Sequence, residues 1–402
     1  MALKAKPPSA AAACGSWVTR FDDGLASGSH RQCLSLDITA PILGKVEQGL
    51  RLNEAEALHL LEHAALVDLT VAATIVRNRN NDPGKVSYII DRNVNYTDVC
   101  NVYCTFCAFY HKPGDPRGYV LTKEQLRQKA EETKALGGTG FLLQGGVNPD
   151  LPWEYYLDLV HYLSHDLGIW VHGFSPIEIQ MMAKLSGQSL RKTLEDLKDA
   201  GLGSIPGGGA EVLVDRIRKK IAPLKGGPEK WLEVMEAAHE AGLKTTATMM
   251  YGITETLAER IEHFRVIREQ QDRALARNNG GGYTAFVAWP FQSGHTVWEG
   301  KLEKPTDTEY LRTIATARIY LDNMPHIQSS WVTMGKKTGQ VALHYGCDDM
   351  GSLMLEENVV SAAGTCYNVN KDEMVRLIHD AGFEPWQRDN VYGIVNPTPW
   401  PV

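Results

Sequence analysis

The stretch Cys100-Asn101-Val102-Tyr103-Cys104-Thr105-Phe106-Cys107 carries three cysteines in the spacing C-x3-C-x2-C. Cysteine thiolates are the usual ligands of iron–sulfur clusters, and three of them can hold three irons of a [4Fe–4S] cluster. The fourth iron would then stay open for another ligand, because no fourth cysteine lies nearby. A structural zinc site is the alternative, although zinc usually takes four ligands in paired spacings and the nearest further candidate is His111.

Around this loop, strand-like runs alternate with helix-like segments. The eight predicted strands are Val86–Arg92, Gly140–Gln144, Ile169–Phe174, Gly203–Pro206, Lys244–Met250, Tyr283–Trp289, Ile327–Trp331 and Val341–Tyr345. The predicted helices between them are 122–136, 153–165, 190–200, 211–220 with 228–241, 256–275 and 306–322. Such alternation predicts an α/β fold with a parallel sheet, and eight units in about 270 residues predict a (β/α)8 barrel of the TIM type. The alternative is a partial barrel of six units followed by a separate C-terminal domain.

The chain on either side of the barrel is predicted to form an extension and a cap. Residues 1–45 are rich in Ala, Gly and Ser with little periodicity, which predicts a mostly irregular segment. A helix is predicted over 53–77, with Asn53 as its N-cap and Glu56 as the capping-box partner. The cap contains a predicted helix near 371–381. The expected division is an N-terminal extension and helix at 1–80, the barrel at 81–346 and the C-terminal cap at 347–402.

The composition, 43% hydrophobic and 22% charged, is that of an ordinary soluble globular protein. The formal net charge of -7 and the lack of a basic stripe argue against a nucleic-acid partner. No uncharged apolar run approaches the roughly 20 residues of a membrane span, and Ala10–Cys14 is too short an apolar run for a signal peptide. Seven cysteines, three of them crowded together, do not resemble a disulfide framework, so a reducing cytoplasm is expected.

Polar and glycine-rich groups recur where the predicted strands end. These groups are the cysteine loop, Gln144-Gly145-Gly146, His172 to Pro176, Pro206 to Glu211, Met250-Tyr251-Gly252 and Trp289 to Gln292. In a (β/α)8 barrel the carboxyl ends of the strands carry the active site. The sequence therefore predicts that this mouth of the barrel carries the chemistry.

Two glycine-bearing segments are candidate ligand sites at the mouth. Gln144-Gly145-Gly146 presents bare backbone that a ligand can approach, although a plain strand-to-helix turn also uses glycines. Pro206 to Glu211 carries three successive glycines before a helix, and Arg218 follows Glu211 by two helical turns on about the same face. The glutamate can hold ribose hydroxyls and the arginine a carboxylate. The alternative is an ion pair on a solvated helix.

His172 and Glu178 are the candidate proton carriers. His172 stands at a predicted strand end, where a functional histidine and a hydrogen-bonded core histidine are both reasonable interpretations. Glu178 follows Ser175 by three residues, so a capping box is the alternative to a catalytic role. The cysteines outside the loop are interpreted as spectators or packing residues: Cys14, Cys33, Cys347 and Cys366.

Several motifs together resemble a known family. They are Arg92 to Thr97 leading into the cysteines, Cys107-Ala108-Phe109-Tyr110, Ile205 to Leu213, Thr245 to Gly252, Ala288 to Gln292 and Gly351 to Val359. The first two resemble radical S-adenosylmethionine (SAM) enzymes of the futalosine pathway and their relatives in deazaflavin cofactor biosynthesis. The others resemble the cyclic dehypoxanthinyl futalosine synthases (dehypoxanthine futalosine cyclases) of menaquinone biosynthesis, over about residues 50 to 385. The chain departs from that pattern at Asp98, His111, Ser293 and His295.

The resemblance implies a [4Fe–4S] cluster on Cys100, Cys104 and Cys107, with SAM on the open iron. It implies that a 5′-deoxyadenosyl radical takes hydrogen from C4′ of the ribose of dehypoxanthine futalosine, and that the carbon radical then adds to the aromatic ring. An external one-electron reductant of the flavodoxin or ferredoxin type is required. On this basis we assign cofactor binding to Phe106, Gln144, Gly145, Gly146, Ser175, Glu211 and Arg218, proton transfer to His172 and Glu178, and substrate binding to His111, Arg117, Tyr251 and Gln292.

Other functions stay open at this point. A sister enzyme, aminofutalosine synthase, adds the same radical to an alkene, although the motif Trp289-Pro290-Phe291-Gln292 disfavours it. The deazaflavin-cofactor enzymes are a further radical SAM alternative. A non-enzymatic zinc or redox-sensor barrel that uses the three cysteines belongs to a different class.

Overall fold

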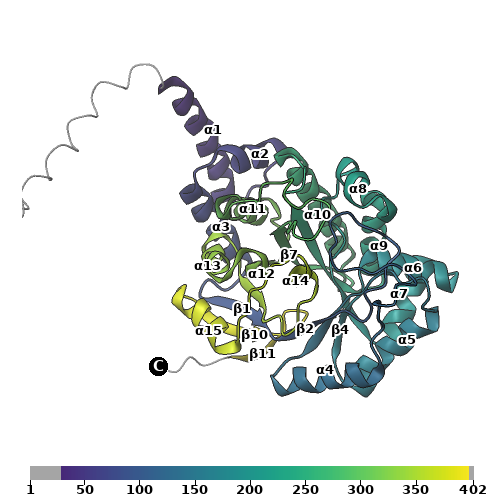
Figure 1. Cartoon of the computed structure of the whole chain (residues 1–402). Coiled ribbons are helices and arrows are strands. Elements are labelled where there is room, and N and C mark those ends of the chain that lie inside the picture. Colours follow the sequence, from purple (N-terminus) through teal and green to yellow (C-terminus); the bar gives the residue numbers. More distant parts are fainter. Residues whose placement is uncertain (1–28, 398–402) are drawn as a thin grey trace, which may run out of the picture.

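Eleven strands form one sheet in the computed structural model, which describes residues 29–397 (Figure 1). The strands are β1 (Lys85–Ile89), β2 (Asp91–Val94), β3 (Gly140–Leu143), β4 (Trp170–Gly173), β5 (Leu202–Ile205), β6 (Lys244–Tyr251), β7 (Gly282–Pro290), β8 (His326–Gln328), β9 (Asp349–Ser352), β10 (Glu384–Arg388) and β11 (Ile394–Pro397). Their order in the sheet is β11-β10-β1-β9-β8-β7-β6-β5-β4-β3-β2. Every neighbouring pair is parallel except β10 with β11.

The two ends of the parallel series meet in one continuous run of chain. β1 pairs with β9, while β2 pairs with β3, and only Ile90 separates β1 from β2. The backbone N–H of Leu353, just after β9, donates to the carbonyl of Ile89 at the end of β1 (3.0 Å). The pairing of β1 with β9 therefore continues to the ends of both strands. The predicted α/β barrel of the (β/α)8 type is confirmed, with β10 as an additional strand beside β1.

An outer layer of helices surrounds the strands in Figure 1. These helices are α4 (Lys123–Ala135), α5 (Trp153–His161), α6 (Pro176–Ser186), α7 (Leu190–Asp199), α8 (Asp215–Ile221), α9 (Pro228–Glu240), α10 (Leu257–Arg277) and α11 (Asp307–Tyr320). All except α6 correspond to predicted helices. Capping boxes begin α4 and α10, as their Thr-x-x-Gln and Thr-x-x-Glu sequences favour. Within the described part of the chain, no helix is long and apolar enough to cross a membrane.

The N-terminal part contains three helices, α1 (Ser29–Gln48), α2 (Glu54–His63) and α3 (Leu66–Asn80). The expected irregular segment is therefore wrong for residues 29–45, and its remainder, with Cys14, lies outside the described residues. The Asn53–Glu56 capping box is confirmed. The single helix predicted over 53–77 is broken because Ala64 and Ala65 adopt extended backbone angles. Both α2 and α3 pack against α11.

The C-terminal part departs most from the predictions. The eighth predicted strand, Val341–Tyr345, is wrong: it lies across the end of α13 (Lys336–Val341) and the 3-10 helix Ala342–Tyr345, and the eighth barrel strand is β9. A short apolar run has no periodicity that separates strand from helix. The other helices here are α12 (Trp331–Met334), α14 (Val359–Ala362) and α15 (Lys371–Asp380). The boundaries at 80 and 346 stay predictions, although β9 and β10 place part of the expected cap in the sheet.

The sheet has an apolar outer face and an inner face that carries both polar and apolar side chains. Outward residues such as Phe141, Val171 and Phe286 are fully buried against the helices. Inward residues include Asn93 on β2 and His172 on β4, and they line a cavity inside the barrel. Barrel interiors are usually filled by branched aliphatic side chains, so the open cavity and the polar side chains in its lining mark this interior as a ligand site.

Candidate active site

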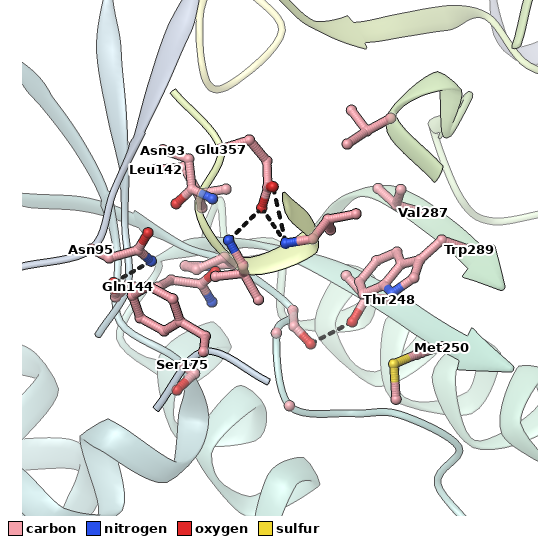
Figure 2. A pocket seen from close by; sticks show the side chains of 18 of the residues that line it. Asn93, Asn95, Leu142, Gln144, Ser175, Thr248, Met250, Val287, Trp289 and Glu357 are labelled. Carbon is pink, nitrogen blue, oxygen red and sulfur yellow. Dashed lines mark hydrogen bonds between the residues drawn. The ribbon is translucent and has the colours of Figure 1, made fainter. Parts of the chain in front are cut away.

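A cavity of about 460 Å³ extends from the cysteine loop into the barrel. In Figure 2, Asn95 and Gln144 lie on one wall, and Thr248 and Trp289 lie on the opposite wall. The predicted site residues that line it are Cys100, Cys104, Phe106, Cys107, Gln144, Gly145, Gly146, His172, Ser175, Glu178, Glu211 and Gln292. The predicted site residues that lie outside its lining are His111, Arg117, Arg218 and Tyr251.

The cysteine loop is held by backbone hydrogen bonds on several sides. The N–H of Cys100 donates to the His111 carbonyl (2.9 Å), and the N–H of Thr105 donates to the Ile221 carbonyl (2.9 Å). Tyr103 adopts a left-handed backbone conformation (φ 53°) that turns the chain between the first two cysteines. These contacts aim three unpaired thiols at one cavity.

The environment of the thiols fits an iron–sulfur cluster. Burial raises the pKa of Cys104 to about 12, and burial also raises the pKa of Cys107, although the N–H groups of Phe109 and Tyr110 act to lower it. Backbone N–H groups near a ligating sulfur are typical of such clusters. Across residues 29–397, no three His, Cys, Asp or Glu side chains converge as ligands of a single ion. A cluster spreads its thiolates over different irons, so this arrangement suits it better than zinc.

Glu211 is the centre of a buried ion network beside the loop. Lys225 donates to Glu211 Oε1 (2.8 Å), and Arg218 lies 3.3 Å from Oε2. Arg218 also donates to the carbonyls of Gly209, Ala210 and Gly226, so it holds the glycine loop together. The alternative of a solvated ion pair is wrong, because both partners are buried. Arg218 is directed away from the cavity, which Lys225 lines instead.

Lys225 connects this network to the cysteine loop. Its ammonium lies 5.1 Å from the centroid of the Phe106 ring. Burial acts to lower the pKa of Lys225, but the nearby Cys104 and Glu211 outweigh it and the net shift is upward. Lys225 is therefore a charged ammonium at neutral pH, facing both the cofactor loop and the cavity.

The glycine pair after β3 is explained by close packing. A side chain at Gly145 would meet the Tyr96 ring, and one at Gly146 would meet the Val99 carbonyl. The N–H of Gly145 donates to Glu178 (3.0 Å). The N–H of Gly146 donates to the carbonyl of Thr97 (2.9 Å). Tight packing therefore requires these glycines, and both still line the cavity.

Glu178 is fully buried and fully hydrogen-bonded. Its Oε1 accepts from the Tyr96 hydroxyl (2.7 Å) and from Gly145, while Oε2 accepts from the N–H (2.7 Å) and hydroxyl (2.6 Å) of Ser175. The capping-box alternative is confirmed. Burial raises the pKa of Glu178 against the lowering effect of these bonds. The carboxylate holds the β3 and β4 loops together and has no oxygen left for a substrate.

His172 lines the cavity from β4. Its Nδ1 lies 2.7 Å from the Ser204 hydroxyl, and that oxygen accepts a bond from the Trp170 indole N–H (3.1 Å). The serine hydrogen is thus available to Nδ1, which assigns the ring hydrogen to Nε2. Burial, with a further contribution from Arg388, lowers the pKa of His172 to about 3. The ring is neutral and presents an N–H donor.

Of the four predicted substrate-binding residues, one lines the cavity and three lie outside its lining. His111 pairs with Asp98 (2.6 Å), and Arg117 is an exposed side chain that pairs with Asp115. Tyr251 is fully buried, with the Arg260 guanidinium 4.3 Å from its ring centroid. Only Gln292 lines the cavity, where its Oε1 accepts from Thr365 (2.9 Å).

Several cavity residues escaped the sequence analysis. Lys225 has no periodic relation to Glu211, since a proline-containing turn separates it from α8. Glu357 caps α14 over the cavity by accepting backbone N–H bonds from Val359 and Val360 (Figure 2). Others include Asn93, Gln328, Arg388, Asn390 and Tyr392. Asp91, Asn93 and Asn95 were a usable signal for the first of them, because short polar side chains at every second position follow the strand period.

Comparison with known proteins agrees with this geometry. A model of the radical SAM superfamily matches residues 94–267, and a model of the CofH/MqnC C-terminal region matches residues 280–400. The crystal structure of the FeFe-hydrogenase maturase HydG from Carboxydothermus hydrogenoformans superposes with a TM-score of 0.66 at 17% identity, covering 90% of this chain and 82% of that one. That structural likeness supports the fold.

The chain is 42% identical over 355 residues to the cyclic dehypoxanthine futalosine synthase of Halalkalibacterium halodurans, covering 88% of this chain and 94% of that protein. It is 44% identical over 356 residues to the enzyme of that name from Streptomyces coelicolor, covering 88% of each. The aminodeoxyfutalosine synthase of Thermus thermophilus is 37% identical over 358 residues, with 88% and 94% covered. The chain therefore belongs to the radical SAM superfamily and, within it, to the family of the cyclic dehypoxanthine futalosine synthases.

Proposed function

We propose that this enzyme converts dehypoxanthine futalosine to its cyclic form in menaquinone biosynthesis. One observation carries the proposal: the three thiols and the polar barrel interior line the same cavity. When bound, the cluster and SAM supply a 5′-deoxyadenosyl radical that takes hydrogen from C4′ of the ribose, after which the carbon radical adds to the aromatic ring and an electron and a proton leave. The 42% and 44% identical relatives support this reaction.

The residues of the mouth hold the cofactors. Cys100, Cys104 and Cys107 ligate the cluster, and their loop is already fixed by its backbone contacts. Glu211 binds the SAM ribose. Lys225 takes the SAM carboxylate in place of Arg218, because Lys225 lines the cavity beside the cysteine loop while Arg218 is bound to three carbonyls.

The barrel wall orients the substrate and excludes water. Trp289 and Phe291 supply apolar surface for the aromatic ring, and Val360 closes the cavity from the C-terminal segment. A radical reaction requires close contact between the reacting carbons and the absence of other hydrogen donors. We also propose a flavodoxin- or ferredoxin-type reductant and a cytoplasmic location. We propose no nucleic-acid partner, and the net charge of -7 supports this last point.

An isotope experiment tests the reaction. With deuterium at C4′ of dehypoxanthine futalosine, an anaerobic assay is expected to yield labelled 5′-deoxyadenosine and an unlabelled C4′ in the cyclic product. The 37% identical Thermus relative keeps aminofutalosine synthase as the alternative. That activity would instead form an adduct that retains the adenosyl group, without 5′-deoxyadenosine as coproduct. Such an adduct, or retention of the label at C4′, would refute the proposed cyclisation.

A further inference from the structure

The inner end of the cavity is a polar chamber that the cofactors do not explain. We use "lower chamber" for Asn93 on β2, His172 on β4, Gln328 on β8 and Asn390 after β10, all of which line the cavity. Asn93 is in register with Leu142, and Leu142 with His172, so two of these side chains lie at one level of the barrel.

Two amides of the lower chamber have a carbonyl oxygen without a hydrogen-bond partner. Asn93 is 5% exposed and Asn390 is 7% exposed, and within the described residues neither Oδ1 atom has a partner. Asn95, the next inward residue of β2, differs: it donates to the Gln144 carbonyl (3.0 Å) and accepts from Asn358 (3.2 Å). In Figure 2 a dashed bond ends at Asn95 and none at Asn93. Because buried polar groups are normally paired, the two unpartnered amide oxygens indicate a ligand.

The chemistry of the lower chamber favours neutral hydroxyl groups. Arg388, which lines the same cavity, is already paired with Asp349 (3.0 Å), and the buried Asp91 accepts a hydrogen bond from the neutral Ser352 hydroxyl. No unpaired cation remains there for a carboxylate. An amide side chain both donates and accepts, as a hydroxyl does, and His172 adds one N–H donor.

We propose that the lower chamber binds the ring hydroxyls of the substrate ribose, with Asn93 and Asn390 as the specificity-determining residues. This inference rests on the proposed function for the identity of the ribose. Depth supports it: Asn93 lies two residues, or about 7 Å, below the level of Asn95 and Gln144. A ribose at that depth lies directly beneath the cofactor level, where C4′ must be.

Equilibrium binding to the cluster-loaded enzyme tests the proposal without turnover. The probes are dehypoxanthine futalosine and its 2′,3′-dideoxy analogue. Wild-type enzyme is expected to bind the analogue about tenfold more weakly, since each lost hydrogen bond costs a few-fold to tenfold. Asn93→Leu and Asn390→Leu are each expected to weaken binding of the natural ligand about tenfold and to reduce the discrimination between the two probes.

Stability measurements separate a binding role from a structural one. Asn93→Leu removes an unpaired buried oxygen, so its urea midpoint should equal or exceed the wild-type value. The matched control is Gln271→Leu, which breaks two hydrogen bonds to the Tyr283 backbone (2.9 and 2.8 Å) outside the cavity. That control should lose stability and keep the affinity for both probes.

Each outcome decides the inference. Equal affinity of wild-type enzyme for the two probes, or binding of neither probe, overturns it. Undiminished affinity in both leucine variants, or a lowered urea midpoint in both, also overturns it. Hydroxyl-dependent binding without any cyclic product refutes the proposed reaction and leaves the ribose-binding chamber standing.

Discussion

The two ends of the cavity differ in how their polar groups are satisfied. At the mouth, Glu178 accepts four hydrogen bonds and Glu211 binds two cations, so the cofactor end is rigid before any ligand arrives. In the lower chamber, Asn93 and Asn390 each have an amide oxygen without a partner among the described residues. The difference indicates that internal bonds preorganise the mouth for reactive cofactors, while the lower chamber leaves its bonds for the substrate.

The largest effect is expected at the mouth. Replacing Cys100, Cys104 or Cys107 by Ala should abolish iron incorporation and turnover, because three thiolates leave no spare ligand. Iron content and the visible absorption of the anaerobic protein measure this. Cys366→Ala, at an exposed cysteine, is the control and should behave as wild type. A loop variant with wild-type iron content would show that its cysteine is not a ligand.

The second-largest effect is expected at the buried ion pair between Arg388 and Asp349 beside the lower chamber. Arg388→Met leaves Asp349 buried without its cation, which should destabilise the fold by about 3–5 kcal/mol. Urea unfolding measures it. Arg117→Met is the control, since its ion pair with Asp115 is exposed and contributes little to stability. Equal urea midpoints for the two variants would contradict the paired charges on which the preference for hydroxyl groups depends.

The mouth was largely predictable from sequence, and the lower chamber was not. Cysteine spacing and glycine loops are local signals, so the three loop cysteines and Glu211 could be placed at the cavity without a structure. The eighth strand was misplaced at Val341–Tyr345, because Asp349-Met350-Gly351-Ser352 lacks β-branched residues and pairs only through tertiary contacts. Asn390 enters the cavity only because β10 lies beside β1.

Local pattern also misassigned some partners at the mouth. Arg218 was correctly placed beside Glu211 by helical spacing, but spacing does not reveal that its guanidinium faces three carbonyls. Tyr251 follows a strand end, yet its side chain belongs to the packed layer outside the barrel. Strand position predicts the level of a residue in the barrel, whereas its direction depends on the register.

Lys225 is the residue of the mouth that we expect to bind the SAM carboxylate. Lys225→Met should weaken SAM binding about 10- to 100-fold, the range of a charge-assisted hydrogen bond, while the cluster stays intact. Equilibrium binding of SAM measures this, with exposed Lys219→Met as the matched control. Arg218→Ala should act mainly on stability. Normal SAM affinity in Lys225→Met would show that another residue binds the SAM carboxylate.

The smallest effect is expected at His172, in the lower chamber. Its ring is assigned as a neutral donor through Nε2, because Ser204 serves Nδ1. His172→Gln keeps an N–H donor and should lower kcat/KM by less than about fivefold, while His172→Leu should lower it by about tenfold. Loss of a general base would cost about 10²- to 10⁴-fold in both.

The pH dependence distinguishes the donor from the base. With a pKa lowered to about 3 by burial and Arg388, His172 takes up a proton only well below neutral pH. Between about pH 6 and 9, the kcat/KM profiles of wild type and His172→Gln should therefore have the same shape. A base that titrates in this range would be protonated as the pH falls, and wild type alone would then lose activity toward pH 6. If wild type loses activity toward pH 6 and His172→Gln does not, His172 is the proton acceptor. His172 would then be a catalytic residue and not a hydrogen-bond donor to the substrate.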